Sequence, residues 1–268
     1  MYEKESGQMK ISIIGAGHMG GAMIRGWVRS NAVSPQDILV KGGKKGTASK
    51  LQEELKFTLV ESYEDMANSD IIYLAVNTKL IVPILTDLYA CLGTQRIPIV
   101  SVSAGVTLEE MLLVTGKDYP LAKAIPNTPV QINQGITGVA LADGMTPLAN
   151  DILTDTLRLL GESVTIEEDQ LGIFGTLAGC GPAFVDVFME ALADGAVLHG
   201  MDRDMAYHVA ASMVSSAANL LLETGKHPGE LKDGVTSPGG TTIKGITAME
   251  KNGFRYATIS AIDTIMTP

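Results

Sequence analysis

The chain has 268 residues, 46% of them hydrophobic, so it is long enough for one large domain or two ordinary ones with a full core. This composition argues against intrinsic disorder. Twenty basic against thirty acidic residues give a net charge of −10, and the longest basic run is the pair Lys44-Lys45. Binding to nucleic acid through a basic face is therefore disfavoured.

Three further observations concern location. Cys91 and Cys180 show neither a disulfide framework nor the spacing of a zinc ribbon, which favours a reducing, cytoplasmic location. The first ten residues are polar and charged, unlike the apolar core of a signal peptide. Residues 205–222 carry no formal charge but contain a histidine, an asparagine and three serines. We expect a helix in a protein interior or interface there, with a membrane span as the alternative.

In residues 1–166, short apolar strands alternate with helical stretches, the pattern of a parallel, doubly wound sheet covered on both faces. The predicted strands are residues 10–14, 37–41, 58–60, 70–76, 97–101, 121–125, 137–141 and 163–166. The predicted helices between them include residues 18–29, 47–55, 80–92 and 147–160.

From residue 167 onward the strand-like alternation stops, and apolar residues recur at helical spacing. The predicted helices are residues 167–178, 182–198, 203–223, 228–232, 241–251 and 254–267. We therefore expect an α/β dinucleotide-binding Rossmann domain over residues 1–166, followed by an all-helical domain over residues 167–268.

The chain is rich in glycine, with 29 residues, about 11% against a usual share of roughly 7%. Gly15, Gly17 and Gly20 form G-x-G-x-x-G between the first strand and the first helix, with His18 and Met19 inside the motif. Such glycines permit a tight turn, close approach to a pyrophosphate, and helix–strand packing. The motif predicts a dinucleotide site, and a purely structural turn is the alternative.

The second predicted strand ends at Lys41, followed by Gly42, Gly43, Lys44 and Lys45, without the carboxylate that usually binds the ribose of NAD. Because a carboxylate would repel a 2′-phosphate and lysines would attract one, we predict NADP over NAD. An ordinary solvated loop is the alternative interpretation.

A second glycine cluster precedes a predicted helix and reads Val235-Thr236-Ser237-Pro238-Gly239-Gly240-Thr241-Thr242. A turn that leads into a helix N-terminus can hold a carboxylate on backbone N–H groups, here those of Gly240 to Thr242. A capped turn without a ligand is the alternative.

Four segments together resemble the pyrroline-5-carboxylate reductase family, in family order and over nearly the whole chain. They are the glycine motif, Ala124-Ile125-Pro126-Asn127-Thr128-Pro129, Gly179-Cys180-Gly181-Pro182-Ala183-Phe184, and the segment from His227-Pro228-Gly229 through Asp233 to Ser237-Pro238-Gly239-Gly240-Thr241-Thr242-Ile243. The glycine motif is generic, whereas the last segment is highly specific.

The resemblance implies reduction of L-1-pyrroline-5-carboxylate to L-proline with NADPH, or with NADH, in the last step of proline biosynthesis. It implies that the catalytic Thr242 faces the ring nitrogen, while Val235, Ser237, Gly240 and Thr241 surround the substrate carboxylate. Asn127 matches a strand-end asparagine near the nicotinamide. The resemblance also implies a homodimer through the helical domain, which in the family often assembles further into decamers.

Two segments depart from the family pattern. Val76-Asn77-Thr78 replaces the usual Val-Lys-Pro, which leaves cofactor details open at Asn77, and Cys180 replaces a serine. The scattered histidines and the Asp186, Glu190 and Asp194 stripe predict no metal site. The alternatives are a reductase of another cyclic imino acid, such as piperideine-6-carboxylate, and a non-catalytic NADP-binding regulator. A β-hydroxyacid dehydrogenase is disfavoured, because that family places a catalytic lysine on an early helix of its second domain and residues 124–225 contain no lysine.

Overall fold

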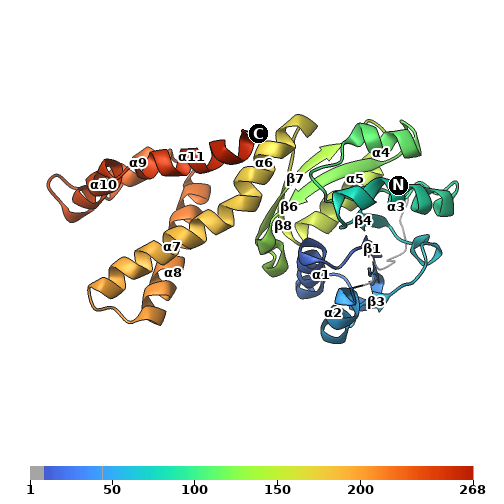
Figure 1. Ribbon diagram of the computed structural model, residues 1–268, viewed down its shortest axis with the longest axis horizontal. Helices are drawn as coiled ribbons and strands as arrows, with labels where there is room; N and C mark the ends of the chain where they lie inside the picture. Colours follow the sequence, from blue (N-terminus) through green and yellow to red (C-terminus); the bar gives the residue numbers. More distant parts are fainter. Residues whose placement is uncertain (1–8, 44, 268) are drawn as a thin grey trace. The chain divides into compact units, whose positions relative to one another are not determined.

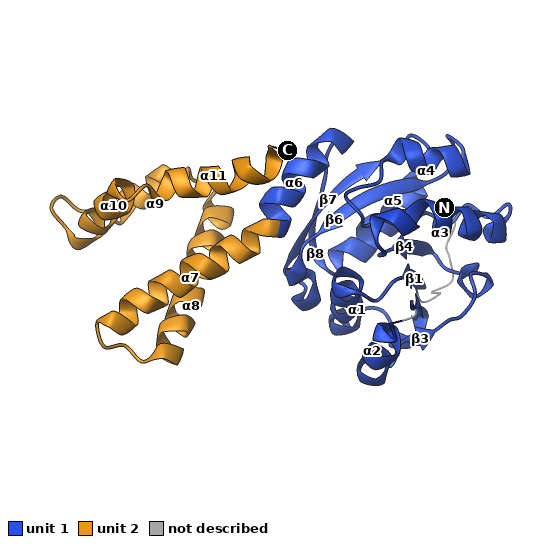
Figure 2. Cartoon of the chain, in the orientation of Figure 1, with its two compact units in different colours: residues 1–179 blue, residues 180–268 orange. Residues whose placement is uncertain are grey.

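The computed structural model describes residues 9–43 and 45–267 (Figure 1). The chain divides into two compact units, residues 1–179 and 180–268 (Figure 2). The predicted doubly wound domain and helical domain are both present.

The first unit contains an eight-stranded sheet with the order β3-β2-β1-β4-β5-β6-β7-β8. Its strands are β1 (Ile11–Ile14), β2 (Ile38–Lys41), β3 (Thr58–Leu59), β4 (Ile71–Leu74), β5 (Ile99–Ser101), β6 (Leu121–Pro126), β7 (Gly135–Leu141) and β8 (Gly161–Thr165). All eight predicted strands are present. The chain leaves β3 at one edge and returns on the other side of β1, so the order reverses between β1 and β4, where such sheets bind ligands.

The last two strands differ from the all-parallel expectation, because β7 pairs antiparallel with β6 while β8 runs parallel to β7. The cause is the short connection from β6 to β7, which contains only the turn η3 (Thr128–Ile132). A parallel neighbour needs a crossover of about a dozen residues or more.

Helices cover both faces of the sheet, and the side chains of β1 and of β4 to β7 are divided between two apolar clusters. Ile11 and Ile13 of β1 join the cluster beneath α1 (His18–Ser30), α2 (Thr47–Leu55) and α5 (Pro147–Arg158). Ile14 joins the opposite cluster, beneath α3 (Thr78–Leu92), α4 (Leu108–Thr115) and α6 (Leu171–Gly175). The core of this unit is therefore complete within one chain.

Helix α4 was not predicted, although its start carries a recognisable signal. The Thr107 hydroxyl accepts a hydrogen bond from the Glu110 N–H at 3.1 Å, and the Glu110 carboxylate accepts one from the Thr107 N–H at 2.8 Å. This reciprocal pair is a capping box.

Within residues 180–267, the secondary structure of the second unit is helical throughout, as predicted from the periodicity. Its helices are α7 (Gly181–Leu198), α8 (Arg203–Thr224), α9 (Pro228–Gly234), α10 (Thr241–Lys251) and α11 (Phe254–Met266). Between α6 and α7 the chain forms a π-helical turn over Thr176–Cys180. Pro182 lacks the N–H that would bond to the Ala178 carbonyl in a regular α-helix, which accounts for a wider turn at this point.

The first compact unit extends to residue 179 and so includes residues 167–179, which the sequence analysis grouped with the helical domain. The reason is that residues 167–179 pack on the sheet. Leu171 is buried in the sheet's apolar cluster, and Lys123 of β6 forms an ion pair with Glu168 at 2.7 Å.

Residues 168–198 and 203–224 are long and apolar enough to cross a membrane, by length and composition alone. Only 11% of the most apolar window of each is buried. Helix α8, predicted for an interior or an interface, is therefore not an interior helix of a single chain.

Candidate active site

The turn after β1 places the three glycines of the motif in three different surroundings. Gly15 has a φ of +105°, and a Cβ there would lie 2.3 Å from the Ala75 carbonyl oxygen. A Cβ at Gly20 would lie 2.1 Å from the Gly15 carbonyl oxygen. These two positions therefore require glycine for a tight turn and for close packing of α1 on the strand.

Gly17 differs, because no atom of the residues that the structure describes lies within 4 Å of the position where its Cβ would be. It is exposed at the N-cap of α1, where no side chain caps the helix. The first N–H groups of α1 therefore have no side-chain cap, which leaves them available to the oxygens of a pyrophosphate. His18 is exposed as well, whereas Met19 packs its side chain against the core and offers its backbone.

Lys41, at the end of β2, is already engaged. Its ammonium donates a hydrogen bond to the Glu61 carbonyl and lies 5.2 Å from the centre of the Tyr63 ring. Lys44, part of the predicted phosphate-binding loop, lies outside the described residues, and Lys45 is exposed. The Lys41 side chain is therefore held against the segment that follows β3, by its contacts with Glu61 and Tyr63.

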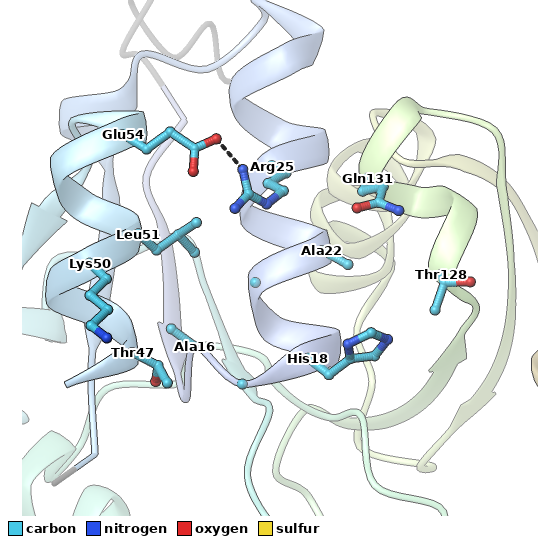
Figure 3. A pocket seen from close by; sticks show the side chains of 12 residues that line it. Ala16, His18, Ala22, Arg25, Thr47, Lys50, Leu51, Glu54, Thr128 and Gln131 are labelled. Carbon is cyan, nitrogen blue, oxygen red and sulfur yellow. Dashed lines mark hydrogen bonds and ion pairs between the residues drawn. The ribbon is translucent and has the colours of Figure 1, made fainter. Parts of the chain in front are cut away.

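A cavity of about 490 Å³ adjoins the glycine turn. Figure 3 shows its lining from α1, α2 and the η3 segment. Arg25 of α1 and Glu54 of α2 form an ion pair across it, and the hydrogen bond from Arg25 lowers the pKa of the Glu54 carboxyl. The sequence showed both helices but not this groove, because which faces of α1 and α2 oppose each other depends on how both pack on the sheet.

Asn77 and Asn127 follow two strands of the same sheet. Asn77 is exposed at the N-cap of α3 and caps no N–H group with its side chain. Asn127 is 7% exposed, and both ends of its amide are engaged. Its Nδ2 donates to the Ala178 carbonyl at 3.1 Å, and its Oδ1 accepts from the Ile136 N–H at 2.9 Å. Asn127 thus supplies the donor that Pro182 cannot supply to Ala178.

The predicted carboxylate loop lies in the second unit, between α9 and α10. Gly239 has a φ of +68°, and the Gly240 N–H donates to the Ser237 carbonyl at 3.0 Å, which closes a turn. Thr241 and Thr242 are exposed in the first turn of α10, and no side chain caps that helix at Gly240. The N–H groups that begin α10 are therefore available to an anion.

Val235, before this turn, is 67% exposed and lines a cavity of about 380 Å³ between α8 and α9. The residues predicted around a substrate carboxylate, from Val235 to Thr242, thus form one local turn. Those predicted around the cofactor all belong to the other compact unit.

Comparison with known proteins covers both units. Residues 168–267 match the family model for pyrroline-5-carboxylate reductase dimerisation, and residues 10–105 match the model described as NADP oxidoreductase, coenzyme F420-dependent. The chain is 37% identical over 260 residues to the pyrroline-5-carboxylate reductase of Escherichia coli, an alignment that covers 97% of this chain and 96% of that one. The chain belongs to the pyrroline-5-carboxylate reductase family.

Other pyrroline-5-carboxylate reductases give the same result. The enzyme of Methanosarcina acetivorans is 35% identical over 257 residues, with 94% of each chain covered. The solved structure of the Coxiella burnetii enzyme superimposes with a TM-score of 0.85 at 27% identity, covering 97% of this chain and 96% of that one. The Plasmodium falciparum structure, described with NADP bound, has a TM-score of 0.83 at 24% identity over 97% of each chain and supports the fold.

Proposed function

We propose that this protein reduces L-1-pyrroline-5-carboxylate to L-proline with NADPH. The observation that carries the proposal is the 37% identity to the Escherichia coli reductase over 97% of the chain, because it includes both the glycine turn and the Thr242 loop. The geometry is consistent with it, since one turn presents free N–H groups for a pyrophosphate and another presents them for a carboxylate.

The residues of the glycine turn fit a dinucleotide. The open space at Gly17 admits a pyrophosphate where any side chain would intrude, and the first N–H groups of α1 would hold its oxygens. In this proposal Gly15 and Gly20 shape the turn, while His18, Met19, Lys41 and Asn77 border the cofactor. The Asn127 amide is already bonded to the Ala178 carbonyl and the Ile136 N–H. In this proposal Asn127 therefore positions the backbone beside the nicotinamide and does not itself bind the ring.

The substrate half of the proposal uses the turn before α10. The N–H groups of Thr241 and Thr242 would bind the substrate carboxylate, with Val235 and Ser237 around it. The Gly240 N–H, which the sequence placed in this group, is instead bonded to the Ser237 carbonyl and shapes the turn. NADPH, when bound, supplies the hydride that the imine carbon accepts. The electron pair of the C=N bond then moves to nitrogen, which takes a proton. The Thr242 hydroxyl would orient this nitrogen and relay the proton from water.

The deciding measurement is oxidation of NADPH by the purified protein with pyrroline-5-carboxylate and with piperideine-6-carboxylate side by side. We expect faster turnover of the five-membered ring. Faster turnover of the six-membered ring would identify a piperideine-6-carboxylate reductase instead. The two substrates differ by one methylene, which changes the binding free energy by only about 1–3 kcal/mol, so both must be measured. Absence of turnover with either would favour the non-catalytic regulator.

Thr242→Ala tests the assigned catalytic residue. We expect kcat/KM to fall about 10-fold or more, the scale of one orienting or acid–base contact. Thr247→Ala is the matched control, because Thr247 lies on the same helix and donates its hydroxyl to the Ile243 carbonyl at 2.8 Å. Wild-type activity in Thr242→Ala would contradict this role.

We also propose a cytoplasmic homodimer formed through the helical unit, with decamers as the higher assembly. The match of residues 168–267 to a dimerisation family supports the dimer. The exposed apolar side chains of this unit support it too, among them Val187 at 66%, Ile259 at 68% and Leu222 at 72% exposed.

A further inference from the structure

The region after β2 is positively charged over a stretch without any acidic residue. Residues 38–52 contain Lys41, Lys44, Lys45 and Lys50, and neither aspartate nor glutamate. This stretch follows the strand beside β1, so it borders the side of the glycine turn where the adenosine ribose of a dinucleotide binds. The question is which lysine is available to a ligand there.

Lys41 is poorly placed for that role. Its ammonium is bonded to the Glu61 carbonyl and lies over the Tyr63 ring, so binding a ligand would require breaking both interactions. Lys45 is exposed and lines none of the cavity beside the glycine turn. Lys44 lies outside the described residues.

Lys50, in contrast to Lys41, is available to a ligand. It projects from α2 and lines the 490 Å³ cavity together with Gly17 and Thr47. Within residues 9–43 and 45–267, its ammonium takes part in none of the hydrogen bonds or ion pairs. Figure 3 shows the Lys50 side chain directed toward the end of the groove where Thr47 and Ala16 lie.

Arg25, also in the cavity, does not compete for this role. Glu54, four residues after Lys50 on α2, is the natural helical partner of Lys50 but is ion-paired with Arg25 instead. The Arg25 charge is therefore neutralised across the groove, and the Lys50 charge is left free. The Thr47 hydroxyl is exposed beside it and adds a neutral donor.

We infer that Lys50, together with the Thr47 hydroxyl, binds the phosphomonoester on the adenosine ribose of NADPH and so determines the preference for NADPH over NADH. This inference rests on the proposed function. It assigns the preference to the first turns of α2 rather than to Lys41 at the end of the strand. A charge-assisted hydrogen bond from an ammonium to a phosphate is among the strong polar contacts, and losing it lowers affinity about 10-fold or more.

The test is calorimetric binding of two nucleotides to the full-length protein, adenosine 2′,5′-bisphosphate and adenosine 5′-monophosphate. We expect the wild type to bind the bisphosphate about 10-fold more tightly, and Lys50→Gln to bind both nucleotides about equally through loss of bisphosphate affinity alone. Lys50→Arg should restore the difference. Lys56→Gln is the matched control, because it removes the same charge just beyond the other end of α2 and should keep the wild-type preference.

Two outcomes would overturn the inference. One is that Lys50→Gln keeps the wild-type preference for the bisphosphate, and Lys41→Gln and Lys45→Gln would then show whether either of those lysines carries it. The other is that the wild type does not distinguish the two nucleotides. Failure of the wild type to bind either nucleotide would contradict the cofactor assignment in the proposed function itself, and this inference with it. Turnover with NADPH alongside an unchanged Lys50→Gln preference would leave the reductase proposal intact.

Discussion

The two units use apolar residues in opposite ways. In the first, both faces of the sheet are covered, and side chains as large as Trp27 and Tyr73 are fully buried. In the second, the buried side chains within residues 180–267 are only those of Ala193, Ala206 and Ala210. A sheet with helices on both faces closes its core within one chain, whereas these helices leave apolar faces that a second copy would cover.

The largest expected effect comes from placing a charge on the exposed apolar surface of the second unit. Val187→Asp should abolish the dimer and the activity with it, because a carboxylate would be buried unpaired in the interface. Leu113→Asp is the control, since Leu113 is 82% exposed on α4 of the first unit. Sedimentation velocity reports the assembly. If the Val187→Asp variant remained a dimer, the face of α7 that carries Val187 would lie outside the interface.

The next effect concerns the closed core of the first unit. Trp27 is fully buried, its Nε1 donates to the Thr156 carbonyl at 2.9 Å, and its ring lies 5.1 Å from that of Tyr73. Trp27→Ala should lower the free energy of unfolding by about 3–5 kcal/mol. Urea unfolding followed by circular dichroism measures this, with Trp27→Phe as a milder control. If Trp27→Ala left the urea midpoint unchanged, the conclusion that the first unit completes its core within one chain would be wrong.

A smaller effect is expected at the buried ion pair that ties residue 168 to the sheet. The Lys123 side chain is 5% exposed and that of Glu168 is 32% exposed, with 2.7 Å between their charged atoms. Glu168→Gln should cost about 2 kcal/mol, because it leaves the ammonium unpaired beside a partly solvated site. Adding Lys123→Met should recover most of this loss. A double-mutant cycle on unfolding free energies measures the coupling, and additive losses would rule it out.

The smallest effect is the pH dependence of the α4 capping box. Hydrogen bonds from the Thr107 N–H and hydroxyl hold the pKa of Glu110 below its ordinary value. Its stabilising contribution is therefore present above the unfolded-state pKa and lost as the pH falls through the lower folded-state pKa. The stability difference between wild type and Glu110→Gln, from thermal unfolding at several pH values, should shrink in that acidic range. A difference independent of pH would contradict this.

Much of the architecture was predictable because it depends on local patterns. Short apolar runs between helical stretches located all eight strands, and apolar residues at helical spacing located the helices of the second unit. The antiparallel direction of β7 was not predicted, because it depends on the connection between β6 and β7, which is too short for a crossover. Helix α4 was predictable in principle from Thr107 and Glu110, three residues apart.

The candidate site divides in the same way. The turn that needs glycine at positions 15 and 20 could be inferred from spacing, because the steric demand of a strand–turn–helix unit is local. The sequence does not distinguish the lysines that follow β2 from one another, whereas packing places Lys41 and Lys50 in different surroundings. Lys41 meets Glu61 and Tyr63, which are twenty residues or more away in sequence, whereas Lys50 lines the groove between α1 and α2.

Local sequence patterns were sufficient to indicate the family, the succession of strands and helices along the chain, and the two turns that lead into uncapped helix N-termini. Which charges are neutralised, and which stay unpaired among the described residues, depends on how the elements pack. An ion pair such as Arg25–Glu54 depends on two helices packed side by side on one sheet, and no spacing along the chain encodes that distance.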